Sequence, residues 1–137
     1  MKKNKLNFQN YLVSIITPLF NCEKYIRDTI ESVIVQDYTN WEMIIVDDCS
    51  DDKSTDVVHE YTTTDNRIQL IINKTNKGAG YCRNLAIKKA KGEFIAFLDS
   101  DDIWSPNKLS KHLEFMHKNN SAFSHTSYGY IDDLGNK

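Results

Sequence analysis

The chain has 137 residues, of which 40% are hydrophobic and 26% charged, enough for one folded domain with its own core and unlike a disordered chain. A net charge of −2, from 17 basic and 19 acidic residues, gives no overall attraction to nucleic acid or to an anionic membrane, so any anion must be held locally. Its three cysteines show no C-x-x-C spacing, which argues against a disulfide framework or a zinc knuckle and indicates a reducing, cytoplasmic setting.

Four short apolar runs predict β-strands, because β-branched and aromatic residues dominate each of them. We expect these strands at residues 13–17, 41–46, 68–72 and 93–98. Residues 122–131 are expected to be extended, and Leu134-Gly135-Asn136 to form a turn. The aromatic side chains that follow strand and helix patterns are expected in the core: Phe94, Phe97, Phe115 and Phe123.

Helical periodicity appears between these runs and after the last one. The first helix is expected at about 21–36, with Asn21 as its N-cap. The others are expected at 54–61 behind Ser54 or Thr55, at 81–90, and from Ser105-Pro106 onward.

Strand and helix alternate with short connections, which implies right-handed crossovers and a mostly parallel sheet covered by helices on both faces. The predicted fold class is therefore α/β. In open sheets of this kind ligands bind beyond the carboxyl ends of the strands. Polar clusters follow all four strands, so we expect one polar rim made of these segments: Pro18 to Asn21, Asp47-Asp48, Asn76 to Gly80 and Asp99 to Asp102.

Asp99-Ser100-Asp101 places two carboxylates at i and i+2 on a bend after a buried strand. Crowded carboxylates require a cation or strong donors, and hard oxygen ligands suit Mg²⁺ or Mn²⁺. The competing interpretation is a helix N-terminal turn, where Asp is also favoured. A calcium-binding hand is excluded because Trp104 and Ser110 stand where its Gly and bidentate Glu belong.

Two further segments of the rim allow more than one interpretation. Asp47-Asp48 suits a second metal site, an acceptor for a base or ribose, or a solvated turn. The segment from Asn76 to Arg83 joins a glycine loop to a helix start, which suits an anion. It comes near the dinucleotide fingerprint, but Arg83 replaces the third glycine and the loop follows the third strand, where the fingerprint is not expected.

Four sequence blocks together resemble the family-2 glycosyltransferases of the GT-A fold, which are Rossmann-like. In chain order they are VSIITPLFN at 13–21, IIVDDCS at 44–50, NKG at 76–78 with Arg83-Asn84, and AKGEFIAFLDSDD at 90–102. The resemblance implies metal-dependent, inverting transfer of a sugar from a nucleotide-diphospho-sugar, usually UDP-linked, to a hydroxyl acceptor.

The same resemblance implies roles for single residues. Asp99-Ser100-Asp101 looks like the family's D-x-D motif, with Asp101 as the main ligand of Mn²⁺ or Mg²⁺ and Asp99 beside it, near the ribose or donor sugar. Asp48, supported by Asp47, would hold the base, and Arg83 would lie near the diphosphate or base. The remaining expected donor-site residues are Pro18, Phe20, Asn21, Glu23, Gly78 and Ser100. Phe20 departs from the family, which usually has Tyr there.

The family's catalytic base lies well after the D-x-D motif, whereas this chain ends 36 residues after Asp101. We therefore expect an N-terminal extension at 1–12 and an incomplete donor-binding domain at 13–137, which lacks the acceptor half and has little activity alone. The resemblance further implies a glycan or lipid-linked acceptor, and peripheral association of the full-length protein with the inner membrane face.

Two other functions remain as alternatives. A nucleotidyltransferase would share the sheet and the metal carboxylates, but it usually carries a Gly-rich basic loop after the first strand, where this chain has Pro18 to Asn21. The second alternative is a non-catalytic nucleotide-binding module that keeps the fold.

Overall fold

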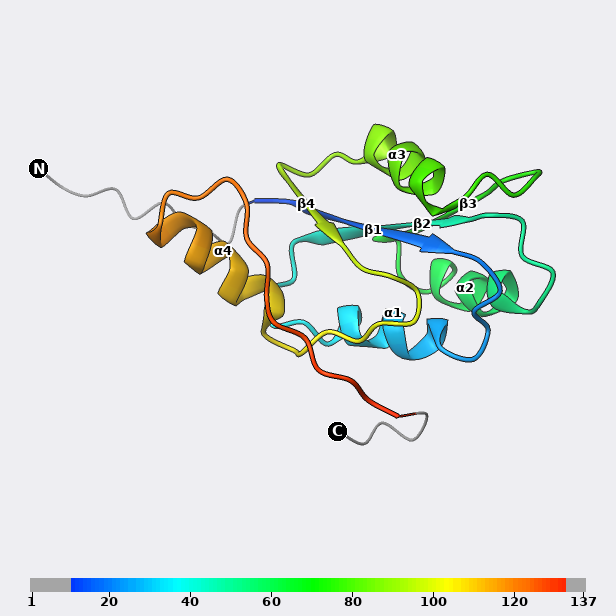
Figure 1. The fold of residues 1–137 in the computed structure, drawn as a ribbon, viewed down its shortest axis with the longest axis horizontal. Helices are drawn as coiled ribbons and strands as arrows, with labels where there is room; N and C mark the ends of the chain where they lie inside the picture. Colours follow the sequence, from blue (N-terminus) through cyan, green and yellow to red (C-terminus); the bar gives the residue numbers. More distant parts are fainter. Residues whose placement is uncertain (1–10, 133–137) are drawn as a thin grey trace, which may run out of the picture.

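The computed structural model describes residues 11–132 and contains one four-stranded parallel sheet in that range (Figure 1). The strand order is β3-β2-β1-β4, so β1 and β2 are central and β3 and β4 form the edges. The strands are β1 (Val13–Leu19), β2 (Trp41–Asp47), β3 (Ile68–Ile72) and β4 (Phe94–Phe97). Each strand pairs with its neighbour in parallel, so the carboxyl ends of all four strands lie at the same end of the sheet.

Helices cover both faces of the sheet. They are α1 (Ile26–Ile34), α2 (Ser54–Thr62), α3 (Ala79–Lys89) and α4 (Lys108–Lys118). In Figure 1, α3 lies on one face, whereas α1 and α2 lie on the other and α4 packs near the amino end of β1. The predicted α/β class with helices on both faces is therefore confirmed. Within residues 11–132 no helix is long and apolar enough to cross a bilayer.

The core divides into two apolar layers, one on each face of the sheet. Alternate side chains of β1 and β2, such as Ile15 and Met43, pack with α1 and with Trp104 in the larger layer. The opposite side chains, such as Ile16 and Ile44, pack against α3 in the smaller one. All residues of β1 and β2 are buried, because each strand has a neighbour on both sides and a helix on both faces.

The two central strands also carry a buried polar connection to the segment before β4. Glu42 accepts hydrogen bonds from Ser14 Oγ and the Lys91 amide, both at 2.7 Å, and Ser14 Oγ accepts one from the Gly92 amide at 2.8 Å. Glu93 accepts from the Leu12 amide at 2.7 Å. These contacts of residues 91–93 hold the amino end of β4 against the amino end of β1, at the end of the sheet opposite the rim.

Three predicted helix caps or starts are wrong. Asn21 is not an N-cap: α1 begins at Ile26, and Asn21 has a φ of 47° in a loop. The last helix begins at Lys108 instead of Ser105-Pro106, because the Ser105 and Pro106 carbonyls accept hydrogen bonds from the end of the α1 region. Ser54 is the first residue of α2 and not its cap.

The region after α4 differs partly from the expectation. No strand is assigned at residues 121–132, and the predicted turn at 134–136 lies outside the described residues. Phe97, Phe115 and Phe123 were expected in the core but are 54%, 55% and 75% exposed. Phe97 lies on β4, which among the described residues pairs only with β1, so this edge strand is less covered than the two central ones.

Candidate functional site

The carboxyl ends of the strands surround a cleft of about 510 Å³. All four polar segments expected at the rim line this cleft. The segment after β2 contributes one residue, Asp48, and each of the other three contributes at least three. The lining residues are Pro18, Leu19, Phe20, Asp48, Asn76, Gly78, Ala79, Arg83, Asp99, Ser100 and Asp101. A cavity of about 760 Å³ between β4 and α4 is larger, but it lies outside this rim, and none of the predicted site residues lines it. The polar cleft is therefore the candidate site.

Hydrogen bonds join the loop after β1 to the loop after β2. The Asn21 amide donates to Ser50 Oγ, and Asn21 Oδ1 accepts from the Asp51 amide, both at 2.9 Å. The positive φ of Asn21 allows this paired contact, and Asn is among the residues that tolerate it. Asn21 therefore joins the two loops and does not line the cleft.

Glu23 forms a second reciprocal contact between the same loops. Its amide donates to Asp52 Oδ2 at 3.0 Å, and its Oε2 accepts from the Lys53 amide at 2.8 Å. Between these contacts the Cys22 amide donates to Ser54 Oγ at 2.8 Å. Like Asn21, Glu23 lies outside the cleft lining, so the structure gives both residues a role in holding the loops.

Asp47 and Asp48 are both buried but have different roles. Asp47 accepts from the amide and hydroxyl of Ser50, so it stabilises the turn that leaves β2. Asp48 reaches toward the loop after β3, where its carboxylate accepts from Asn73 Nδ2 at 2.8 Å and from the amides of Lys77 and Gly78 at 2.6–3.0 Å. Only Asp48 lines the cleft.

The electrostatics of Asp48 follow from these contacts. Burial acts to raise its pKa, but the hydrogen bonds from Asn73, Lys77 and Gly78 outweigh burial and hold the pKa below its ordinary value. The carboxylate is therefore an anion supplied by the protein at the glycine loop.

That anion bears on the dinucleotide interpretation. Gly78 has a φ of 85°, a conformation that favours glycine, and it precedes α3. In a dinucleotide site such loop amides would face the pyrophosphate. Here the amides of Lys77 and Gly78 already donate to Asp48, which removes the physical basis for the fingerprint.

The turn after β4 is anchored on α1 through Ser100. Its carbonyl accepts from Thr29 Oγ1 at 2.9 Å and from Cys22 Sγ at 3.4 Å. Ser100 is 9% exposed, whereas Asp99 and Asp101 on either side of it are exposed. The buried middle residue thus directs the two flanking carboxylates to the surface of the cleft.

Negative charge is crowded at this turn. Burial, followed by repulsion from Asp101 and Asp99, raises the pKa of Asp102 above its ordinary value. Within residues 11–132 the Asp101 carboxylate makes no hydrogen bond or ion pair, and no group of three or more His, Cys, Asp or Glu side chains gathers around a metal position. Two exposed carboxylates fit a Mg²⁺-type ion that takes one or two carboxylates and completes its shell with water and phosphate oxygens.

Arg83 stands across from this turn, on α3. Its Nη2 lies 2.6 Å from Asp99 Oδ1, and the two side chains are 35% and 50% exposed. The guanidinium and the two carboxylates therefore lie in the same cleft with opposite charges.

The cleft brings together most of the residues singled out from the sequence. Pro18, Phe20, Asp48, Gly78, Arg83 and the Asp99-Ser100-Asp101 turn line it, whereas Asn21, Glu23 and Asp47 support the loops around it. Leu19, Asn76 and Ala79 also line the cleft; the sequence placed them in the expected rim segments but gave none of them an individual role. Their adjacency to Phe20 and Gly78 was the available signal.

Solved structures share this fold. Staphylococcus aureus TarS in complex with UDP-GlcNAc superimposes with a TM-score of 0.74 at 35% identity, over 79% of this chain and 32% of that one. The fold is therefore that of the GT-A glycosyltransferases.

The chain belongs to glycosyl transferase family 2, which matches residues 14–137. It is 50% identical over 124 residues to the putative teichuronic acid biosynthesis glycosyltransferase TuaG of Bacillus subtilis (strain 168), covering 90% of this chain and 49% of that protein. It is 48% identical over 124 residues to the Escherichia coli UDP-Glc:alpha-D-GlcNAc-diphosphoundecaprenol beta-1,3-glucosyltransferase WfgD, covering 90% and 48%. The chain thus spans about half the length of these curated relatives.

Proposed function

We propose that the cleft binds the nucleotide-diphosphate part of a UDP-linked sugar, which serves as donor for transfer to a hydroxyl acceptor. The observation that carries this proposal is the pairing of the exposed Asp99 and Asp101 carboxylates with Arg83 in one cleft. A nucleoside diphosphate is an anion that needs positive charge, and a guanidinium beside a cation site provides it. The UDP-GlcNAc complex of TarS and the UDP-Glc named for WfgD support a UDP-linked donor.

The cation in this proposal is Mn²⁺ or Mg²⁺, held by Asp101 with Asp99 beside it. When bound, it offsets the negative charge that builds on the leaving diphosphate. Ser100 keeps both carboxylates in place through its carbonyl contacts with α1. Arg83 contacts a phosphate oxygen, and a bidentate contact through both of its Nη groups requires Nη2 to leave Asp99.

The uracil and ribose lie against Pro18 and Phe20 at the β1 end of the cleft. Phe20 is 50% exposed there, so its ring face is available for stacking. Asp48 acts mainly by fixing the glycine loop, because three donors already occupy its carboxylate. The loop then supplies Asn76 and Gly78 to the same wall.

The transfer is proposed to invert the anomeric centre, which requires a general base at the acceptor hydroxyl. No described carboxylate is assigned as that base, because Asp48 is hydrogen-bonded and both Asp99 and Asp101 are assigned to the cation. The acceptor is proposed to be a glycan or a lipid-linked saccharide, as the diphosphoundecaprenol substrate in the name of WfgD suggests. With such an acceptor the reaction would occur at the cytoplasmic face of a membrane.

Titration calorimetry of the chain with UDP, GDP and NAD⁺, each with and without Mn²⁺, tests the donor assignment. We expect UDP to bind more tightly with Mn²⁺, and Asp101→Asn to remove that increase. Asp56→Asn, which neutralises an exposed carboxylate on α2, is the matched control and is expected to bind as the unchanged chain does. Tight NAD⁺ binding without metal, or UDP binding indifferent to Mn²⁺ and to Asp101, would contradict the proposal.

A further inference from the structure

Positive charge is concentrated in one continuous segment of the chain. Residues 73–92 contain six basic side chains and no Asp or Glu, although the whole chain has 17 basic and 19 acidic residues and a net charge of −2. The rest of the chain therefore carries eleven basic and nineteen acidic side chains. The basic residues of the segment are Lys74, Lys77, Arg83, Lys88, Lys89 and Lys91.

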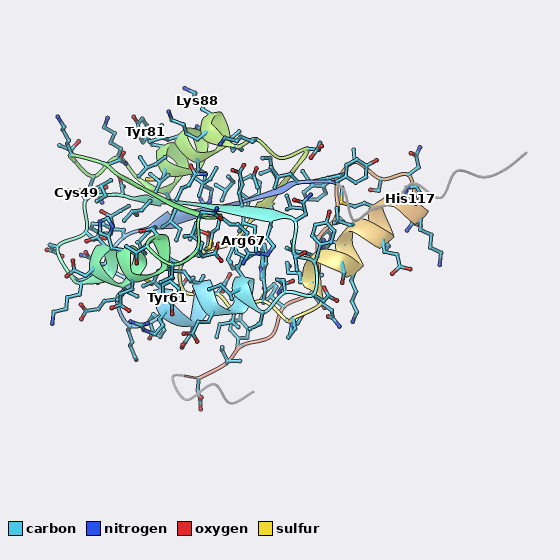
Figure 2. All side chains as sticks on the ribbon, turned by 180° about the vertical axis from the view of Figure 1, so that it is seen from behind. Cys49, Tyr61, Arg67, Tyr81, Lys88 and His117 are labelled. Atoms are coloured by element: carbon cyan, nitrogen blue, oxygen red, sulfur yellow. The ribbon has the colours of Figure 1, made fainter. Side chains whose placement is uncertain are left out.

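This segment forms α3 and its two connections, and within residues 11–132 α3 is the helix that covers its face of the sheet (Figure 1). All five lysines are exposed, whereas Cys82 and Ala86 face the core. Figure 2 shows Tyr81 and Lys88 on the side of α3 that points away from the sheet. They are seven residues apart, which is two helical turns, so they lie on one stripe. We call this outward surface of residues 74–91 the α3 face.

The proposed donor site does not account for this charge. Arg83 points to Asp99, and Lys77 lies over the Tyr81 ring, 4.5 Å from its centroid. Lys88, Lys89 and Lys91 follow at the far end of the helix, which at 1.5 Å per residue lies roughly 10–15 Å beyond the cleft end. That is more than a Debye length of about 8 Å at physiological salt, so these lysines contribute little to holding a diphosphate.

Stabilisation of α3 explains only part of the positive charge in residues 73–92. Lys88 and Lys89 lie in the last turn of α3, where cations interact favourably with the helix dipole. Lys74 precedes the helix and Lys91 follows it, so neither belongs to a helical turn. Charge on both connections, with no compensating acid between them, indicates a surface that faces a negative partner.

Apolar side chains lie among these lysines. Tyr81 is 43% and Ile87 39% exposed, both on α3. A soluble polyanion would bind through charge and would not bury these apolar side chains. A bilayer interface, in contrast, accommodates Tyr rings, aliphatic side chains and the methylene stems of lysines, whose charged groups stay at the headgroups. The combination of charge and apolar surface favours lipid over a soluble polyanion.

We propose that the α3 face binds the surface of an anionic lipid bilayer, with α3 parallel to the membrane plane. The lysines contact lipid headgroups, and Tyr81 and Ile87 enter the interfacial layer. The sheet then lies above α3, and the cleft opens at the amino end of the helix, beside the membrane. The more acidic remainder of the chain, including α1 and α2, faces away from the negative lipid surface.

Vesicle co-sedimentation tests this proposal, with vesicles of pure phosphatidylcholine compared with vesicles that contain 30–50% phosphatidylglycerol, both at about 0.1 M salt. We expect binding only to the anionic vesicles and its loss at about 0.5 M salt. Each lysine close to an anionic surface contributes about fivefold to affinity, so Lys88→Gln, Lys89→Gln and Lys91→Gln together are expected to weaken binding more than tenfold.

The matched control removes three exposed lysines from other elements: Lys53→Gln, Lys111→Gln and Lys118→Gln. It has the same net charge as the α3 variant and is expected to bind within about twofold of the unchanged chain. Equal loss in both triple variants would mean that only net charge matters and would overturn the proposal. So would equal binding to neutral vesicles.

A separate variant distinguishes lipid from a soluble polyanion. Tyr81→Ser with Ile87→Ser is expected to weaken vesicle binding severalfold while leaving retention on a polyanion resin unchanged. If vesicle binding does not respond to this double variant, the α3 face is a polyelectrolyte surface and the lipid proposal fails. Circular dichroism of each variant checks that α3 is still formed.

Discussion

Arg83 and Asp99 form an ion pair across the candidate donor cleft, with Nη2 of one 2.6 Å from Oδ1 of the other. The pair connects α3 with the turn after β4, two elements on opposite sides of the cleft. Asp99 cannot give its full charge to a cation while Arg83 holds it, and the Nη2 group of Arg83 that contacts Asp99 is not free to contact a phosphate. When donor and cation bind, Asp99 should therefore contact the cation in place of Arg83, and Arg83 should contact the diphosphate in place of Asp99.

Replacement of Arg83 is expected to affect metal and nucleotide in opposite directions. In Arg83→Gln, Mn²⁺ alone should bind about three- to tenfold more tightly, because Asp99 is released and a nearby positive charge is removed. UDP with Mn²⁺ should bind about tenfold more weakly, because a charged hydrogen bond to the diphosphate is lost. Loss of the free Mn²⁺ signal in electron paramagnetic resonance and calorimetry with UDP measure the two effects.

Lys77→Gln is the control for that experiment, because Lys77 is a cation at the same rim whose amine contacts Tyr81 and, among the described residues, forms no ion pair. Its Mn²⁺ affinity should change less than twofold. If Arg83→Gln weakens Mn²⁺ binding, the ion pair does not compete with the metal.

Asp48 should contribute more to stability than other acids at the strand ends. Asp48→Asn places an amide where two backbone donors point, and it is expected to lower the free energy of unfolding by about 1–3 kcal/mol at pH 7. Burial raises the pKa of Asp48, but hydrogen bonds lower it further, so the folded pKa lies below the unfolded one. Its stabilisation is thus present above about pH 4 and is lost as the pH falls through the folded pKa.

Urea unfolding at several pH values measures this effect. The difference between the unchanged chain and Asp48→Asn should be largest near pH 7 and should shrink below about pH 4. Asp51→Asn, a neighbouring exposed carboxylate, should stay within about 0.5 kcal/mol of the unchanged chain. A difference that grows as the solution is acidified would contradict the assignment.

Gly92 is expected to tolerate no side chain. A Cβ there would lie 2.6 Å from the Leu12 carbonyl oxygen and 2.7 Å from the Ser14 amide nitrogen, so backbone would have to move. Gly92→Ala should therefore lower the free energy of unfolding by about 1–3 kcal/mol and disturb the Gly92 contact with Ser14. Thermal and urea denaturation measure the change.

Gly80→Ala gives the opposite expectation and serves as the comparison. Gly80 lies in α3, and a Cβ there meets nothing within 4 Å. The substitution should raise the free energy of unfolding by about 0.5–1 kcal/mol, because alanine favours the helix. Equal effects of the two substitutions would show that close packing at Gly92 is unimportant.

The three cysteines should react with thiol reagents in two classes. Cys49 is exposed, whereas Cys22 and Cys82 are buried. Burial raises the pKa of both buried thiols, and the pKa of Cys82, which also lies beside Asp48, reaches about 11. At about pH 8 a disulfide reagent should label one thiol quickly and the other two only in denaturant. Rapid labelling of all three in the folded protein would be inconsistent with the two buried positions.

Local patterns in the sequence were sufficient to predict the order of the strands and helices and the position of the polar rim. Short apolar runs marked β1 to β4 within one or two residues, and acids directly after β2 and β4 predicted a shared edge, because parallel strands end together. The Asp99-Ser100-Asp101 turn was found in the same way. These features depend only on neighbours along the chain.

Features that depend on distant contacts were missed. Asn21 has the residue type of an N-cap, but its side chain bonds to Asp51, which lies thirty residues away. The sequence predicted Asp48 at the rim, but it could not show that the amides of Lys77 and Gly78 donate to its carboxylate. Phe97 fits a core pattern, but periodicity cannot show that β4 has one paired side in residues 11–132.

The reciprocal contacts of Asn21 and Glu23 make the loops after β1 and β2 a single unit for protein engineering. If only one loop is transferred from a relative, its hydrogen-bond acceptors no longer face the backbone amides of the other loop. The conformations of both loops would then be lost. Residues 20–24 and 50–54 should accordingly be exchanged as a pair when donor preference is redesigned. In directed evolution, beneficial changes in one loop are then expected to arise together with compensating changes in the other.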